Sequence, residues 1–281
     1  MHISIVIPAH NEEKFLEVCL ESFVVQTQPP EELIIVDDNS SDRTFEIATA
    51  FSKKYDWISV LQRKSSDKHR PGKKVVDAFN YGLKYVSNYN LIGKFDADIV
   101  LPSNYFEQMC NHFQSNWKLG MCSGLLYIKK DENWVYENIA EKTHIRGPIK
   151  LYHQACFNKI EGLRLGTGWD TVDTLLAKYH DFETLTDENL KVKHLRPTGK
   201  GYTAKNYQAK GEALYRMRYG LPLAKIALLK MALQAKSPKL YLQGIFSYLG
   251  AWLTRKERFV NTDEGRFIRQ LRWKGILAKL F

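Results

Sequence analysis

Two carboxylates one residue apart are the part of this sequence with the clearest chemical potential. Asp96 and Asp98 follow residues 91–95, an apolar run with the pattern of a short buried strand. Carboxylate oxygens are the hard ligands that Mg²⁺ and Mn²⁺ prefer, and such an ion can bind a diphosphate. The pattern Asp-x-Asp is also common in solvated turns. The expected positions of the surrounding strands and helices are therefore needed to choose between a metal site and a solvated loop.

Apolar runs alternate with amphipathic segments along the first hundred residues. We expect strands at residues 3–7, 32–36, 58–61 and 91–95, separated by helices that begin near residues 15, 43 and 73. This alternation predicts βαβ units, and therefore an α/β fold with a mostly parallel sheet and flanking helices. We interpret Asn11 as the N-cap of the first helix.

Three polar loops follow the expected strands. In a parallel sheet the loops after residues 7, 36 and 95 lie at one edge, where ligands of open α/β sheets bind. They carry His10, Asn11 and Glu12 on the first, Asp37 and Asp38 on the second, and Asp96 and Asp98 on the third. This convergence favours the metal site over the plain loop. The sequence has no glycine-rich phosphate loop, so a metal and basic side chains would have to neutralise the phosphates.

Length and composition indicate an ordinary globular protein. The 281 residues, 44% of them hydrophobic, can form one large α/β domain with an appendage or two modest domains. The four Cys are scattered without metal-ligand spacing, which indicates free thiols in a reducing compartment. Because the sequence shows neither a charged leader nor an apolar run of about 18 residues, we expect no signal peptide and no membrane-spanning helix.

The positive charge is concentrated at the C-terminal end. Residues 201–281 hold 16 Lys and Arg against 4 Asp and Glu, whereas residues 1–200 hold 25 against 27. We therefore expect a catalytic domain at 1–200 and a basic helical extension at 201–281. Residues 240–253 carry no charge and 254–281 interleave basic with aromatic residues, a pattern typical of helices that lie on anionic lipid. The alternative is a helical subdomain that packs on the core or on a partner subunit. No nucleic-acid recognition motif accompanies the charge.

Four motifs in order resemble glycosyltransferase family 2. They are residues 5–12 (IVIPAHNE), residues 35–42 (IVDDNSSD), Gly72-Lys73 with Ala78, Asn80 and Gly82, and Asp96-Ala97-Asp98. The resemblance covers about residues 1–200. It implies the GT-A fold, a Rossmann-like α/β fold, and an inverting enzyme that uses a nucleotide sugar.

The resemblance also implies roles for individual residues. The nucleotide would be held by Pro8, Ala9, His10, Asn11, Glu12, Asp38, Lys73, Asp96 and Ala97. Asp98 would be the main ligand of a Mn²⁺ or Mg²⁺ ion, with Asp96 shared between the metal and the ribose. The ion would offset charge on the leaving diphosphate.

The second half of the site is less well defined by the motifs. An inverting transfer needs a general base, which the family places in an acidic motif at the start of a helix. Here that place holds Asp170 and Asp173; we favour Asp170, and either could instead cap the helix. His194 could complete the metal shell or reach the diphosphate, and it could equally be a structural histidine. Arg196 is a candidate partner of the diphosphate.

These observations predict an inverting glycosyltransferase that moves a sugar, in our interpretation from a UDP-sugar, to a saccharide or lipid-linked saccharide in cell-surface polysaccharide or glycolipid synthesis. It would be cytoplasmic and peripheral on the inner membrane face, and a homo-oligomer is compatible with the sequence. The alternatives are a sugar-1-phosphate nucleotidyltransferase and a non-catalytic protein that binds a nucleotide sugar or the membrane surface. The nucleotidyltransferase normally needs a glycine-rich N-terminal loop, which residues 8–12 do not supply.

Overall fold

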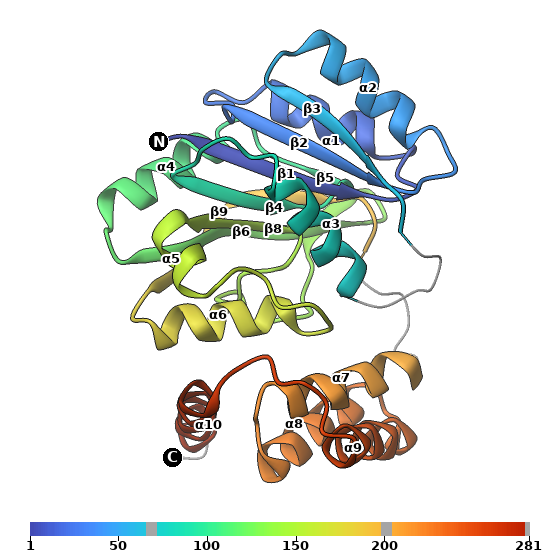
Figure 1. The fold of residues 1–281 in the computed structure, drawn as a ribbon, viewed down its shortest axis with the longest axis vertical. Coiled ribbons are helices and arrows are strands. Elements are labelled where there is room, and N and C mark those ends of the chain that lie inside the picture. Colours follow the sequence, from blue (N-terminus) through green and yellow to red (C-terminus); the bar gives the residue numbers. More distant parts are fainter. Residues whose placement is uncertain (66–71, 198–203, 279–281) are drawn as a thin grey trace. The chain divides into compact units, whose positions relative to one another are not determined.

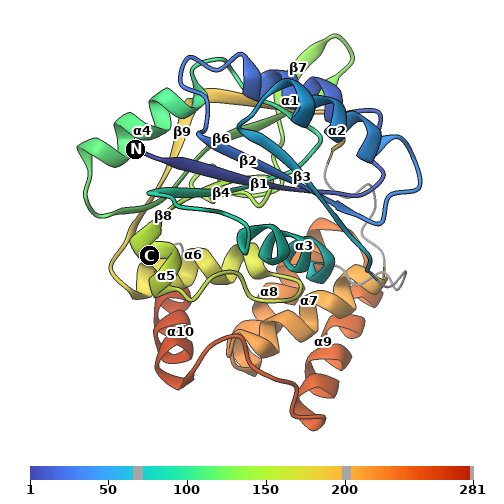
Figure 2. The same cartoon turned by 45° about the horizontal axis from the view of Figure 1, so that its top comes forward.

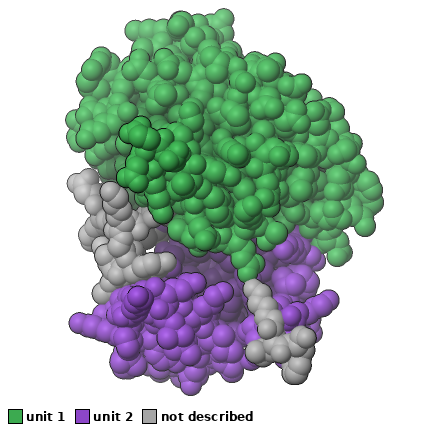
Figure 3. Space-filling view, turned by 180° about the vertical axis from the view of Figure 1, so that it is seen from behind, with its two compact units in different colours: residues 1–69, 74–163, 180–198 green, residues 70–73, 164–179, 199–281 purple. Residues whose placement is uncertain are grey.

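The computed structural model describes residues 1–65, 72–197 and 204–278. The chain divides into two compact units, drawn in green and purple in Figure 3. The first comprises residues 1–69, 74–163 and 180–198, and the second comprises residues 70–73, 164–179 and 199–281. Residues 164–179 thus group with the basic tail, although they precede position 200 by a wide margin. The predicted domain boundary at 200 stays a prediction.

One sheet runs through the first unit (Figure 1). Its strands are β1 (Ile3–Ala9), β2 (Glu32–Asp38), β3 (Ile58–Arg63), β4 (Leu91–Phe95), β5 (Ile99–Val100), β6 (Leu119–Lys130), β7 (Asn133–Tyr136), β8 (Ile149–His153) and β9 (Glu183–His194). Within the described residues their order is β3-β2-β1-β4-β8-β6-β9-β5, and β7 pairs with β6.

The N-terminal half of the sheet is parallel, as the sequence predicts. β1 lies between β2 and β4, with Ile7 opposite Ile35 and Ile5 opposite Gly93. β3 pairs in parallel with the outer side of β2. The carboxyl ends of β1, β2 and β4 therefore lie at one edge, and this confirms the predicted convergence of the three polar loops.

The second half of the sheet is mixed. β8 is antiparallel to both β4 and β6, while β9 is parallel to β6. The short strand β5 pairs antiparallel with the end of β9, so Ile99 lies opposite His194. This pairing matters for the site, because it brings the residues just before β5 beside the residues that end β9.

Helices cover both faces of the sheet in the first unit (Figures 1 and 2). α1 (Leu16–Val24), α2 (Thr44–Lys54) and α4 (Tyr105–Ser115) pack on one face, and α3 (Lys73–Leu83) and α5 (Gln154–Lys159) lie on the other. Ile3, Ile5 and Ile7 alternate along β1 into the core under α1. Gly82 of α3 lies so close to Val6 and Val36 that a Cβ there would be 2.7 Å from their methyl carbons.

The start of α1 differs from the sequence-based interpretation. Asn11 is not its N-cap, because the helix begins at Leu16 and the cap position is Phe15. Asn11 instead takes a left-handed backbone conformation with φ 56°. Asn tolerates this region better than most residues, since its short polar side chain can bond locally. The Asn11 side chain accepts a hydrogen bond from Ser41, in the loop that follows β2.

The second unit is helical. It contains α6 (Trp169–Tyr179), α7 (Ala204–Arg216), α8 (Leu221–Gln234), α9 (Pro238–Leu253) and α10 (Thr262–Leu277). α7 and α9 cross where Gly211 meets Gly244, a contact too close for any larger side chain. α6 joins this bundle through an edge-to-face contact of Tyr179 with Phe267 of α10. Among the described helices none is both long and apolar enough to cross a membrane.

Candidate active site

Side-chain hydrogen bonds join the first two polar loops at the edge of the sheet. The His10 ring nitrogen Nδ1 lies 2.8 Å from the carbonyl oxygen of Asp38. The Asn11 amide oxygen accepts a hydrogen bond from the Ser41 backbone N–H at 2.9 Å, and the Asn11 N–H donates to Ser40 Oγ at 3.0 Å. The loop that follows β1 is therefore tied to the loop that follows β2, as a shared nucleotide site requires.

Asp98 lies at the centre of a charged cluster on the third loop. Its carboxylate oxygen Oδ2 accepts a hydrogen bond from Arg196 Nε at 3.0 Å, and Oδ1 is 3.6 Å from His194 Nε2. Arg196 also donates to the carboxylate of Glu12. The pairing of β5 with β9 produces this arrangement, and the Leu195 N–H completes it by donating to the Asp98 carbonyl at 2.8 Å.

A second acidic residue, Glu137, contacts the ring nitrogen of His194 that faces away from Asp98. His194 Nδ1 lies 3.0 Å from Glu137 Oε2, and the same oxygen accepts a hydrogen bond from Arg146 Nη2 at 3.1 Å. All three side chains are buried. No sequence pattern indicated that Glu137 and Arg146 would lie in this cluster. In the sequence Glu137 is an ordinary acidic residue in a polar stretch, and only its burial in the fold reveals its role.

Burial and charge act in opposite directions on the ionisation of this cluster. Burial alone would lower the pKa of His194, but the carboxylates of Asp98 and Glu137 raise it to about 9. Burial would raise the pKa of Asp98, and the positive charges of His194 and Arg196 outweigh this and lower it. Burial raises the pKa of Glu12 despite its bond to Arg196. Charge pairing in this cluster thus favours the protonated form of His194 and the ionised form of Asp98.

Asp96 is held by a lysine that the sequence analysis also missed. Lys94 is buried on β4, and its ammonium donates to Asp96 Oδ1 and, at 3.2 Å, to the carbonyl of Gly147. Ala97 is buried between the two aspartates. The Asp96 carboxylate remains partly exposed, with 30% of its side chain accessible. A ligand at the sheet edge can reach it.

The candidate metal ligands at this edge of the sheet are carboxylates. Asp96, Asp98 and Glu12 supply carboxylate oxygens, the ligands that Mg²⁺ and Mn²⁺ prefer. The buried oxygen Oε2 of Glu12 has no hydrogen-bond partner in the part of the chain that the structure describes. Across residues 1–65, 72–197 and 204–278, however, no three His, Cys, Asp or Glu side chains are grouped so that they could hold a metal ion. His194 has both ring nitrogens directed at carboxylates, so its predicted role as a ligand stays a prediction.

The remaining predicted residues belong to the second unit. Asp173 is buried in α6, and its carboxylate accepts a hydrogen bond from the Thr174 N–H at 2.6 Å. Asp170 lies in the first turn of α6 near Lys210 of α7. Burial lowers the pKa of Lys210, and the Asp170 charge acts against that shift. Lys73 begins α3 directly after Gly72, whose φ is +70°. Their roles as base and nucleotide ligand stay predictions.

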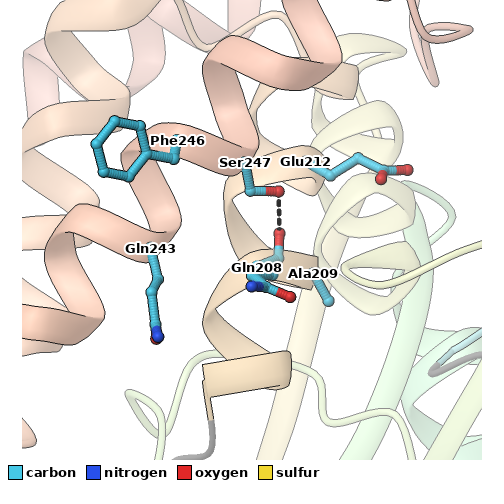
Figure 4. Close-up of a pocket in the computed structure, with 6 residues that line it drawn as sticks. All are labelled: Gln208, Ala209, Glu212, Gln243, Phe246 and Ser247. Atoms are coloured by element: carbon cyan, nitrogen blue, oxygen red, sulfur yellow. Dashed lines mark hydrogen bonds between the residues drawn. The ribbon is translucent and has the colours of Figure 1, made fainter.

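Figure 4 shows a hollow in the second unit. It is an open groove of about 540 Å³ between α7 and α9, lined by Gln208, Ala209, Glu212, Gln243, Phe246 and Ser247. None of the residues that the sequence analysis selected lines it.

Comparison with known proteins identifies the family. The model of the family "Glycosyl transferase family 2" matches residues 4–167, which is more than half of the chain. The chain belongs to glycosyl transferase family 2. The matched segment contains the three loops of the sheet edge and both aspartates of the Asp96-Ala97-Asp98 motif, whereas His194, Arg196 and the two candidate bases lie beyond it.

Relatives within the family are similar over part of their length. The probable glycosyltransferase YdaM of Bacillus subtilis is 41% identical over 98 residues, covering 34% of this chain and 22% of YdaM. The poly-beta-1,6-N-acetyl-D-glucosamine synthase of Staphylococcus epidermidis is 32% identical over 122 residues, covering 43% of this chain and 28% of the synthase. The matches thus span less than a third of either relative.

Two solved structures share the GT-A fold. The mannosyltransferase PcManGT from Pyrobaculum calidifontis, in complex with GDP-Man and Mn²⁺, matches with a TM-score of 0.59 at 15% identity over 100% of this chain and 81% of its own. S. aureus TarS 1–349 in complex with UDP-GlcNAc matches with a TM-score of 0.57 at 16% identity over 83% of this chain and 67% of its own. These likenesses confirm the predicted fold.

Proposed function

We propose that this family 2 glycosyltransferase is a metal-dependent, inverting enzyme that transfers a sugar from a nucleoside diphosphate donor to a saccharide or lipid-linked saccharide. The observation that carries the proposal is the position of Asp98. It lies on the third of three converging loops, within a cluster that also contains Glu12 and Arg196. Solved structures of the same fold whose titles name GDP-Man with Mn²⁺ and UDP-GlcNAc support this class of donor.

The three loops divide the binding of the donor between them. Asp98 would hold the divalent ion, with Asp96 shared between the ion and the ribose. When bound, Mn²⁺ or Mg²⁺ would offset the charge that develops on the leaving diphosphate. The nucleoside would rest on Pro8 to Glu12 and on Asp38. Arg196 is 51% exposed at its side chain, so its guanidinium can turn towards a phosphate without leaving a buried position.

The transfer itself would be a single displacement. The acceptor hydroxyl oxygen attacks the anomeric carbon, the bond from that carbon to the diphosphate oxygen breaks, and the hydroxyl proton passes to a carboxylate. Asp170 is the favoured base, since it lies in the first turn of α6 and is not fully buried. Asp173 is the alternative, although its carboxylate already accepts the Thr174 N–H.

The acceptor class rests on the relatives. A matched protein of Bacillus spizizenii is named poly(ribitol-phosphate) beta-glucosyltransferase, and the Staphylococcus epidermidis match is named for a polysaccharide of N-acetyl-D-glucosamine. These names support a role in cell-surface polysaccharide synthesis, and the TarS complex with UDP-GlcNAc supports a UDP-sugar donor. The basic C-terminal residues support a location on the inner, anionic membrane surface, where a lipid-linked acceptor would be found.

The test is Asp98→Asn, with Asp56→Asn, an exposed turn residue, as the matched control. We expect the variant to lose transfer by about 100-fold or more, the scale on which a lost electrostatic stabiliser reduces turnover. It should also lose the rise in melting temperature that a nucleotide sugar with Mn²⁺ gives the wild type, because only a bound ligand stabilises the folded state. Transfer at the wild-type rate in excess chelator would exclude the metal-dependent mechanism.

A further inference from the structure

The outward face of α9 has the composition of a surface that lies in a membrane. The helix has 16 residues, of which 240–253 carry no charge. Leu240, Gly244, Tyr248 and Ala251 form its buried face against the rest of the second unit. On a helix at the surface of a soluble protein, the face opposite the buried one normally carries polar residues. On α9 the exposed face is largely apolar.

Apolar side chains occupy that opposite face. Leu242, Phe246 and Leu253 follow one another at helical spacing and are 52%, 69% and 73% exposed, and Trp252 beside them is 59% exposed. Figure 4 shows the Phe246 ring directed away from Gln208 of α7, while the neighbouring Ser247 donates to the Gln208 carbonyl at 2.6 Å. The face is therefore a stripe along the helix and not a scatter of single residues.

Positive charges flank the stripe at both ends. Lys236 and Lys239 precede it and Arg255 and Lys256 follow it, all four exposed. Between residues 221 and 256 the sequence holds six Lys and Arg and no Asp or Glu. Such a surface attracts anionic partners and lacks the acidic residues that a mixed protein interface would use.

We infer that α9 lies in the plane of an anionic lipid surface, with its apolar stripe among the acyl chains and its flanking cations among the headgroups. A helix of 16 residues is about 24 Å long and too short to cross a hydrocarbon core of about 30 Å. It can lie in the interface, because its buried face keeps its contacts with α7 while the stripe enters the lipid. This deepens the proposed function by naming the surface that meets the membrane.

The experiment uses the full-length protein and two kinds of vesicle, pure phosphatidylcholine and phosphatidylcholine with 30% phosphatidylglycerol. The stripe variant carries Leu242→Gln, Phe246→Gln and Leu253→Gln. Its control carries Val25→Gln and Trp117→Gln, which remove two apolar side chains that are 63% and 86% exposed in the first unit. A third variant replaces Lys236, Lys239, Arg255 and Lys256 with Gln.

We expect the wild type and the control to sediment equally with the anionic vesicles. The stripe variant should bind the anionic vesicles at least tenfold more weakly than the wild type. The third variant should bind anionic and neutral vesicles with equal affinity. Because all of the changed side chains are exposed, the variants should keep the helicity and melting temperature of the wild type. Donor hydrolysis without vesicles should be unchanged in all of them, so a failed binding result does not depend on the proposed catalysis.

Two results would overturn the inference. In the first, the stripe variant binds vesicles as well as the wild type does. In the second, the wild type fails to bind the anionic vesicles and instead forms a dimer in solution that the stripe variant abolishes, which would assign the stripe to a contact between copies of the chain.

Discussion

At the scale of single residues, the site depends on how Asp98 is surrounded. Both of its carboxylate oxygens face a cationic side chain, His194 on one side and Arg196 on the other. His194 is itself fixed by Glu137. These paired charges fix the orientation of the Asp98 side chain in the absence of a ligand.

The Glu137 carboxylate should be essential for stability. Glu137→Ala removes the partner of two buried cationic groups, Arg146 and His194, and breaking a buried ion pair costs about 3–5 kcal/mol. The control is Glu132→Ala, whose side chain is 93% exposed beside Lys129. It should change the free energy of unfolding by less than about 0.5 kcal/mol. Urea denaturation measures both, and a loss below 1 kcal/mol (on the order of a surface pair) in Glu137→Ala would contradict the prediction.

The pair of His112 and Asp187 should make stability depend on acid pH. Burial would raise the pKa of Asp187, but its bonds to the His112 ring and to the Asn189 N–H, both at 2.8 Å, lower it. A carboxylate whose folded-state pKa is lowered contributes stability above its unfolded value, near 3.9, and this is lost as the pH falls through the folded-state pKa.

We therefore expect Asp187→Asn to be less stable than the wild type by about 0.5–1 kcal/mol at pH 7, a small effect because the pair is partly exposed. Urea denaturation at pH 7, 4 and 3 measures the difference, which should stay nearly constant down to about pH 4 and shrink below it, as the pH falls through the folded-state pKa. A difference that is constant over this range would show that the carboxylate charge is not responsible.

At the scale of elements, two short segments assemble the site. β5 has only two residues, yet its pairing with β9 joins Asp98 to residues nearly a hundred positions later. In the second unit, the loop ahead of α6 is held by Arg216 of α7. Its guanidinium donates to the Leu165 carbonyl at 3.1 Å and to the Glu257 carbonyl at 2.9 Å, and it stacks 3.8 Å from the centre of the Phe259 ring.

Arg216 should therefore position the start of α6, where Asp170 lies. If Asp170 is the base, Arg216→Ala should lower kcat by about tenfold, because small displacements of a catalytic group are costly. The KM for the donor should change less than kcat does, since the nucleotide loops belong to the first unit. Steady-state kinetics separates the two constants. Arg266→Ala on α10, which removes an equal charge from a side chain that is 65% exposed, is the control. Equal loss in both variants would indicate a general charge effect.

At the scale of the whole molecule, the basic tail is built into the second unit together with α6. Phe267 of α10 contacts Tyr179, and the Phe259 carbonyl accepts a hydrogen bond from Arg164 at 3.0 Å. The basic residues of 201–281 therefore belong to helices that pack into a bundle. Binding to a lipid surface and packing on the core or a partner subunit, the two alternatives for the tail, both stay predictions.

Deleting residues 201–281 should accordingly abolish transfer and also uncover apolar surface. Without α7 and α10, the contacts of α6 through Tyr179 are lost, and partly buried residues become exposed. We expect higher fluorescence of a hydrophobic dye and faster proteolysis within residues 164–179 than in the full-length protein. A monomeric, active fragment of residues 1–200 would contradict this and would support the boundary at 200.

The parallel half of the sheet and the polar loops at its edge could be predicted from the order of the residues alone. Short apolar runs at residues 3–7, 32–36 and 91–95 favoured buried strands, and the spacing between them left room for crossover helices. Local pattern was sufficient there, because each strand pairs with a neighbour through the regular βαβ connection. The motif Asp96-Ala97-Asp98 and the family followed from the same residues.

The side chains around Asp98, and the unit to which each helix belongs, could be seen only in the tertiary structure. Glu137, Arg146 and Lys94 became part of the site through burial and through pairings across the mixed half of the sheet, which no local pattern encodes. The left-handed backbone of Asn11 likewise depends on its bonds to the second loop. Charge composition predicted an anionic partner for the tail, but only packing showed which face of α9 is left to meet it.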